Sequence, residues 1–416
     1  MTLNPNKKII RSLFSYTTAT VIAQSLIAVY TLVLIWWLDT EAYGYITANY
    51  ATVLLTSFVI NLGLHEWLIR SIQLNENPKA LTGFVMMYKL IAGVLWTIGL
   101  LLVLPLIKPE IYTRSLLLII ILDVWLESYF NLFLVDLLGH KRVAATSILL
   151  IASKSLRLCS IIIVILLGSK SLIHITLFRV IGTFIVFCIA LFVSKPTISR
   201  MKKPRILEIL RNSFIFNTAE TQNLIFQQLD LNLLTFINGN PALIGDYSVV
   251  ISLFNMIMTI PLGLASLILP HSIEARKTSS SSFKKKMTYI FIGFLILGVL
   301  ICGSLRLLKL DLIYNRLSDN YQSIITIILL ASPIILFKTV NQSNKVYLLS
   351  VEWEKKQLLP QLLAIISKIV LGVVLITNYE LKGMIWVSII SEAVLFFGFM
   401  WQVIRHQLKR ETKPFV

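Results

Sequence analysis

Long apolar stretches alternate with short polar breaks along the whole chain. The hydrocarbon core of a bilayer is about 30 Å thick, and a helix needs about 20 apolar residues to cross it. Twelve stretches approach this length, at residues 13–38, 45–68, 81–104, 115–138, 143–167, 172–193, 213–237, 247–269, 288–305, 321–344, 358–377 and 381–403. The pattern therefore predicts an all-α polytopic membrane protein with twelve transmembrane helices.

The composition agrees with this pattern. The chain has 416 residues, of which 56% are hydrophobic and 14% charged, with a mean hydropathy of +0.81. Water-soluble domains of this length do not show such values. A net charge of +18 could indicate nucleic-acid binding in a soluble protein. In so apolar a chain, the basic excess is better explained by anchors in cytoplasmic loops, so we expect no nucleic-acid partner.

The positions of the basic residues predict the orientation. When the loops are assigned alternately to the two sides, one side and both termini hold 25 basic residues, the other side holds 7, and six lie within helices. Cytoplasmic loops are enriched in lysine and arginine. Both termini are therefore expected in the cytoplasm.

The longest inner connection divides the chain into two halves of six helices. It is rich in basic residues, and its Ile206, Leu207 and Leu210 are spaced for a short helix on the membrane surface. We therefore expect an N-terminal lobe at 1–195, a basic cytoplasmic linker at 196–212 and a C-terminal lobe at 213–416.

A weak internal repeat supports the two lobes. Residues 11–20 align with 211–220, and Glu41–Tyr45 resembles Ala242–Tyr247 at nearly the same offset. Because each half has an even number of helices, both halves begin on the same side of the membrane. The lobes are expected to be related by a pseudo-two-fold axis along the membrane normal.

Charges inside the helices are the best indication of a functional site, because an ionisable group at the bilayer centre costs about 2.5–3.5 kcal/mol. The six basic residues within helices are Lys89, Lys154, Arg157, Arg179, Lys338 and Lys368. A rise of about 1.5 Å per residue places Asp123, Arg157 and Arg179 in one layer, with Glu127 and Lys154 about one turn deeper. Charges from three consecutive helices are thus expected to share one region.

Two interpretations of this region stay open. The acidic pair Asp123 and Glu127 and the basic pair Lys154 and Arg157 each present one helix face, so they could form structural ion pairs. Alternatively, the excess of basic over acidic groups could bind a phosphate or pyrophosphate, because guanidinium and ammonium groups are strong partners of such anions.

A polar stripe follows the seventh helix. Its members are Glu220, Asn223, Gln227 and Asp230, spaced three and four residues apart. Such a face is expected to line an aqueous path or to pack on polar partners, and it suits sugar groups or protons. The carboxylates that could couple transport to an ion are then Asp123, Glu127, Glu220 and Asp230.

The second half holds further polar positions. Lys338, Asn341, Gln342 and Lys345 form a face after Pro333, and Lys368 and Glu392 are expected to pair with each other. The sequence shows no metal-ligand cluster and no nucleophile–base motif, so neither a metal site nor a catalytic residue is expected.

Several features resemble the Wzx-type O-antigen flippases of the multidrug/oligosaccharidyl-lipid/polysaccharide (MOP) exporter superfamily. The resemblance covers the whole architecture and three local stretches, which are Leu38-Asp-Thr-Glu-Ala-Tyr-Gly44, Leu62-Gly-Leu to Arg70 and Leu138-Gly-His-Lys-Arg142. It implies a V-shaped pair of bundles around a cavity that opens to alternate sides of a bacterial inner membrane.

The resemblance also implies a cargo. This would be an undecaprenyl-pyrophosphate-linked oligosaccharide, such as the O-antigen unit of lipopolysaccharide biosynthesis, moved in exchange for protons or sodium, without a cofactor and alongside other polysaccharide assembly proteins. The expected substrate-binding residues are Lys89, Lys154, Arg157, Arg179, Asn223, Gln227 and Lys338.

Two other functions were weighed against flipping. A MATE-like drug exporter usually carries a working carboxylate in the first or seventh helix. The first helix here has none, but Glu220 and Asp230 keep this alternative open. A membrane glycosyltransferase or O-antigen polymerase could use Asp39-Thr-Glu41, but the longest outer segment, at 306–320, is too short to shape an acceptor pocket. We therefore expect a transporter and not an enzyme.

Overall fold

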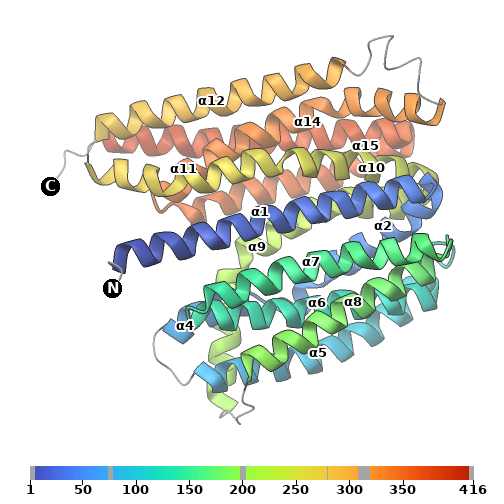
Figure 1. Ribbon diagram of the computed structural model, residues 1–416. Helices are drawn as coiled ribbons and strands as arrows, with labels where there is room; N and C mark the ends of the chain where they lie inside the picture. Colours follow the sequence, from blue (N-terminus) through green and yellow to red (C-terminus); the bar gives the residue numbers. More distant parts are fainter. Residues whose placement is uncertain (1–4, 74–77, 197–202, 279, 308–318, 412–416) are drawn as a thin grey trace. The chain divides into compact units, whose positions relative to one another are not determined.

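The computed structural model describes residues 5–73, 78–196, 203–278, 280–307 and 319–411, and all regular structure in these ranges is helical (Figure 1). The chain divides into two compact units, Met1–Thr221 and Gln222–Val416. The boundary falls inside one helix, α9.

Unit 1 begins with eight helices. They are α1 (Pro5–Trp37), α2 (Thr40–Thr56), α3 (Phe58–Asn61), α4 (Leu64–Gln73), α5 (Pro78–Ile107), α6 (Arg114–Gly139), α7 (Val143–Leu166) and α8 (Leu172–Ser194). The remaining elements are α9 (Lys203–Ile237), α10 (Pro241–Ile257), α11 (Thr259–Thr278), α12 (Ser280–Arg306), α14 (Asp319–Ser350), a short 3-10 turn at Glu354–Gln357 and α15 (Leu358–Glu411).

Nine segments of the described chain are long and apolar enough to cross a membrane. One of them, Glu354–Leu408, contains two of the predicted helices, because the backbone reverses at Glu380 within α15. Another, Pro241–Arg276, combines α10 and α11. The prediction of an all-α, multi-span membrane protein is confirmed.

The predicted linker differs from the structure. Residues 197–202 lie outside the described part, and from Lys203 the chain is already helical. The expected short surface helix and the expected seventh helix form one 35-residue helix, α9, about 52 Å long at 1.5 Å per residue. Hydropathy found only the continuous apolar part of this helix, because charged residues interrupt the apolar ones in its first turns.

The second predicted helix of each half begins in the same way and is interrupted after its first 17 residues. Both α2 and α10 have 17 residues, and their first turns are capped by the side chains of Asp39 and Asn240, which accept hydrogen bonds from backbone N–H groups. The segment that starts with α2 breaks at Ser57 and again at Leu62, where φ is +39°. The segment that starts with α10 breaks at Met258.

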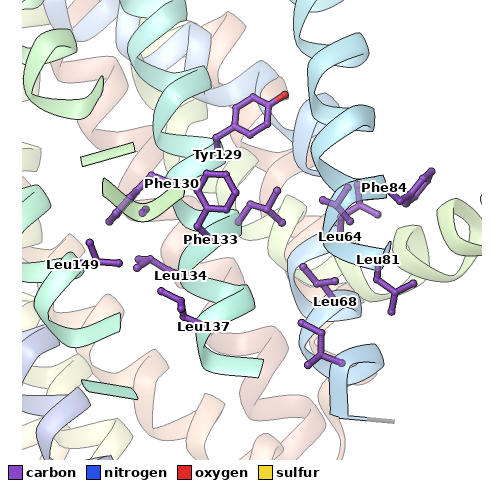
Figure 2. Packing of buried hydrophobic residues seen from close by; sticks show 14 of the residues in the cluster. Leu64, Leu68, Leu81, Phe84, Tyr129, Phe130, Phe133, Leu134, Leu137 and Leu149 are labelled. Carbon is purple, nitrogen blue, oxygen red and sulfur yellow. The ribbon is translucent and has the colours of Figure 1, made fainter. Parts of the chain in front are cut away.

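One central helix organises each unit. In unit 1, α6 packs against α2, α4, α5, α7 and α8, and in unit 2, α14 packs against α10, α11, α12 and α15. Figure 2 shows the apolar cluster on α6, in which Phe130 and Phe133 pack with Leu64, Leu68 and Leu81 from α4 and α5. These side chains are nearly inaccessible, so the cluster fixes the position from which α6 presents its acidic residues.

The reversal at Glu380 divides α15 into a first arm, residues 358–379, and a second arm, residues 381–411. It depends on a close approach of these two arms. Glu380 adopts φ 49° and ψ −123°, and Gly383 lies against the backbone of the first arm. A Cβ atom at this position would overlap the carbonyl oxygen of Leu375, which is backbone and cannot move aside.

Replacing Gly383 by alanine should therefore destabilise unit 2 by about 1–3 kcal/mol, the usual cost of overpacking. The measurement is the temperature of unfolding of the purified protein in detergent. Gly303→Ala is the matched control, because nothing lies within 4 Å of a Cβ at that position. Equal unfolding temperatures for the two variants would contradict this account of the turn.

Candidate functional site

A fully buried carboxylate, Asp123, lies in the middle of α6. It accepts hydrogen bonds from Thr183 Oγ1 at 2.6 Å and from the Tyr50 hydroxyl at 3.0 Å. The guanidinium Nε of Arg179 lies 2.8 Å from Asp123 Oδ2, and the guanidinium carbon lies 4.1 Å from the centroid of the Tyr50 ring. Arg179 and Thr183 are four residues apart on α8, so they reach the same carboxylate. This network joins α2, α6 and α8.

One turn further along α6, Glu127 meets two basic side chains from α7. Lys154 Nζ lies 2.9 Å from its Oε1, and an Arg157 Nη2 lies 3.1 Å from its Oε2. The two cations are three residues apart on α7, as the pattern predicted. Glu127 is therefore shared between an ammonium and a guanidinium group.

We call the five residues Asp123, Glu127, Lys154, Arg157 and Arg179 the unit 1 charge cluster. It holds three cations and two carboxylates, so one positive charge is not balanced within it. The Nε of Arg157 is buried and has no hydrogen-bond partner in the part of the chain that the structure describes. The cluster thus has an unused donor next to an excess of positive charge.

The cluster is closed at one end and partly open at the other. The Asp123 side chain is 0% exposed, whereas the Glu127 side chain is 23% exposed. The exposed apolar residues of α7 lie on the other side of that helix, and they are Ile148, Ile162, Ile163 and Leu166. At 100° per residue, Lys154 and Arg157 point away from this apolar face. The open end therefore does not belong to the lipid-facing stripe of α7.

Lys89 lies apart from this cluster in its contacts. Its side chain on α5 is fully buried, and its ammonium donates to Asn61 Oδ1 at 2.7 Å and to the hydroxyl of Ser128. Asn61 is the last residue of α3, where the second segment breaks. These contacts hold the broken segment against α5 and α6.

Unit 2 holds a second buried ion pair. Lys368 Nζ lies 2.6 Å from Asp230 Oδ1, donates to the carbonyl oxygen of Phe226 at 3.0 Å and lies 3.8 Å from the centroid of the Phe226 ring. The hydroxyl of Tyr247 donates to the other oxygen of Asp230. The prediction that Lys368 pairs with Glu392 is wrong, because the first arm of α15 brings this lysine against α9.

The polar stripe of α9 does not have one environment. Asp230 is buried in its ion pair, Asn223 is half-buried, and Gln227 is exposed. The side chain of Glu220 lies outside the described part. On α14, Lys338 is half-buried and interacts electrostatically with Glu392.

One buried carboxylate escaped the sequence argument. Asp136, near the end of α6, accepts hydrogen bonds from Thr82 Oγ1 at 2.7 Å and Ser194 Oγ at 2.6 Å. It lies inside the predicted helix 115–138, but near its end, and the sequence analysis did not single it out. Among the described residues, no group of three or more His, Cys, Asp or Glu side chains gathers as metal ligands.

The sequence matches no model of a known protein family and no curated protein. Solved structures nevertheless share its fold. An inward-facing multidrug resistance MATE transporter of the MOP superfamily is 12% identical, with a TM-score of 0.75 over 96% of each chain. The lipid II flippase MurJ, in an inward closed conformation, is 13% identical, with a TM-score of 0.69 over 93% of this chain and 87% of that chain.

A third structure, of a MOP superfamily transporter from Pyrococcus furiosus, is 12% identical, with a TM-score of 0.61 over 97% of this chain and 96% of that chain. At these identities the likeness establishes the fold alone. The chain is a multi-pass membrane protein with the fold of MOP superfamily transporters.

Proposed function

We propose that the chain is an alternating-access flippase for an undecaprenyl-pyrophosphate-linked oligosaccharide, such as an O-antigen repeat unit. It would carry this lipid from the cytoplasmic to the periplasmic leaflet of a bacterial inner membrane, with both termini cytoplasmic and transport coupled to an ion. The fold is compatible with a lipid-linked cargo, because one solved structure of this fold is a lipid II flippase.

The observation that carries the proposal is the unbalanced positive charge of the unit 1 charge cluster. Lys154 and Arg157 share Glu127, the only one of the two carboxylates that is partly exposed. A pyrophosphate offers several anionic oxygens to these donors, and charge-assisted hydrogen bonds are about twice as strong as neutral ones. We assign the anion site to Lys154 and Arg157, with Arg179 positioned by Asp123.

The other expected substrate residues take lesser places in this proposal. Lys89 is fully buried by protein, so it would hold α3, α5 and α6 together rather than contact the cargo. Asn223, Gln227 and Lys338 are at least partly accessible, and they remain candidates for contacts with the sugars.

A MATE-like drug exporter is the second candidate, favoured by the TM-score of 0.75 to such a transporter. A cationic drug needs an available carboxylate. Asp123, Glu127 and Asp230 each lie within 3.1 Å of a basic group of the chain itself. Glu392 has no basic group at ion-pair distance among the described residues, but its side chain is buried, so the arrangement favours an anionic cargo. The solved structures of this fold are transporters, which disfavours a glycosyltransferase or a polymerase.

Reconstitution of the purified protein in liposomes would test the proposal. A fluorescent undecaprenyl-pyrophosphate-linked oligosaccharide in the outer leaflet should become inaccessible to a membrane-impermeant quencher much faster than in protein-free liposomes. A cationic dye such as ethidium should not be moved. Transport of the dye without flipping of the lipid would replace the flippase assignment by drug export.

A further inference from the structure

Four acidic side chains are buried in the described part of the chain, and they are Asp123, Asp136, Asp230 and Glu392. The first three have a cation or a hydroxyl donor within 2.8 Å. Glu392, on the second arm of α15, has no such contact. Its only hydrogen-bond donor among the described residues is the Asn341 amide, with Nδ2 at 3.2 Å from Oε2.

Among these four carboxylates, Glu392 alone has neither an ion pair nor a hydroxyl donor among the described residues. The charged groups that face it are Lys338 and Lys345 from α14, Lys368 from the first arm of α15 and Asp230 from α9, and Tyr247 from α10 interacts with it too. None of the three lysines has its ammonium nitrogen within 4.0 Å of a Glu392 carboxylate oxygen. Lys368 is held by Asp230, whereas Lys338 and Lys345 form no ion pair with any described residue.

Asn341 is suited to both protonation states of Glu392. An amide carries two N–H donors and a carbonyl acceptor. Its Nδ2 now donates to the carboxylate, while its buried Oδ1 has no partner in the described part of the chain. If Glu392 takes up a proton, the carboxyl gains an O–H donor, and a half-turn of the amide presents Oδ1 to it. The contact between the two side chains is therefore kept in both protonation states, whereas the longer hydrogen bond from Nδ2 to the Glu392 backbone carbonyl, at 3.4 Å, is lost when the amide turns.

We propose that Glu392 is a proton-binding site that couples transport to a proton gradient. The carboxylate takes a proton from water on one side of the membrane and returns it to water on the other. This inference rests on the proposed function, and it moves the coupling role away from Asp123, Glu127 and Asp230. Those carboxylates are paired with cations of the chain itself.

Infrared difference spectroscopy on the purified full-length protein tests the site without any cargo. Acidification should produce a protonated-carboxyl C=O band that is absent from Glu392→Gln and shifted in Glu392→Asp. Asp136→Asn is the matched control, because it removes another buried carboxylate, and the band should remain. A band that persists unchanged in Glu392→Gln overturns the proposal.

The same liposomes that test flipping then test coupling. For one proton per cycle, each unit of imposed pH difference should change the steady-state ratio of lipid between leaflets up to about tenfold in the wild type and in Asp136→Asn. In Glu392→Gln the ratio should not respond. A Glu392→Gln response equal to that of the wild type overturns the proposal.

The two failures are distinguishable. If the wild type moves no lipid-linked oligosaccharide yet shows the Glu392 band, the proposed cargo is wrong and the proton site stands. If the wild type flips the lipid but the band does not depend on Glu392, the cargo stands and the proton site is wrong.

Discussion

Replacing Arg157 by glutamine is expected to reduce flipping about 10- to 100-fold without lowering the amount of folded protein. A charge-assisted hydrogen bond contributes about 1.5–3 kcal/mol, and each 1.4 kcal/mol corresponds to a factor of ten. The fold should survive because Lys154, at 2.9 Å, still pairs with Glu127 after the substitution. The measurements are flipping in liposomes and restoration of surface polysaccharide in a flippase-deficient strain.

Arg179→Gln is the matched comparison, and it should fail in a different way. Asp123 is fully buried, and Arg179 is the basic group within ion-pair distance of it among the described residues. Removing this partner strands a buried charge, which is strongly destabilising. The variant should accumulate poorly, and adding Asp123→Asn should restore its abundance. An Arg157→Gln protein that is abundant and fully active would remove the anion site from the proposal.

The positions of the unit 1 charges could be predicted because they depend on local geometry. Helix rise and the length of the apolar stretches fix depth, and 3.6 residues per turn fixes the face. These two regularities placed Asp123, Arg157 and Arg179 in one layer and Glu127 and Lys154 about one turn deeper. They did not predict that Arg157 pairs with Glu127. The interpretation of the contacts could not be predicted, because the sequence does not show how far each carboxylate is buried.

The partner of Lys368 could not be predicted for a different reason. Periodicity says which face of a helix is polar, but it does not say which helix lies opposite. The sequence suggested only Glu392 as the partner, and the packing of α15 against α9 shows that Asp230 takes this place. For the same reason, the isolation of Glu392 from close cations became visible only in the structure.

Breaks and continuations of helices were also hidden from hydropathy. The predicted second helix is interrupted at Ser57 and Leu62, although its hydrophobicity is continuous. Conversely, α9 begins at Lys203, before its apolar part. A hydropathy profile reports where a chain prefers lipid, whereas helix ends depend on backbone conformation and on capping, which it does not measure.

The ion pair of unit 2 should have the largest effect on stability. Breaking a buried pair by removing one partner costs about 3–5 kcal/mol, because the other charge remains buried without compensation. Lys368→Met would leave Asp230 with the hydroxyl of Tyr247 as its side-chain hydrogen-bond donor among the described residues, and that hydroxyl also contacts Ser388 at 2.8 Å. We expect this variant to unfold at a much lower temperature in detergent and to accumulate poorly in cells.

Replacing the other member of the pair, Asp230→Asn, should destabilise unit 2 less than Lys368→Met does. The reason is that the Lys368 ammonium has more remaining contacts than the Asp230 carboxylate. Without Asp230, the Lys368 ammonium keeps the Phe226 carbonyl at 3.0 Å and the face of the Phe226 ring at 3.8 Å. The double variant Asp230→Asn/Lys368→Met should recover most of the stability lost in Lys368→Met, since neither charge is then stranded. A double-mutant cycle on unfolding temperatures measures this coupling. If the double variant is no more stable than Lys368→Met alone, the lysine stabilises unit 2 through its packing and not through its charge.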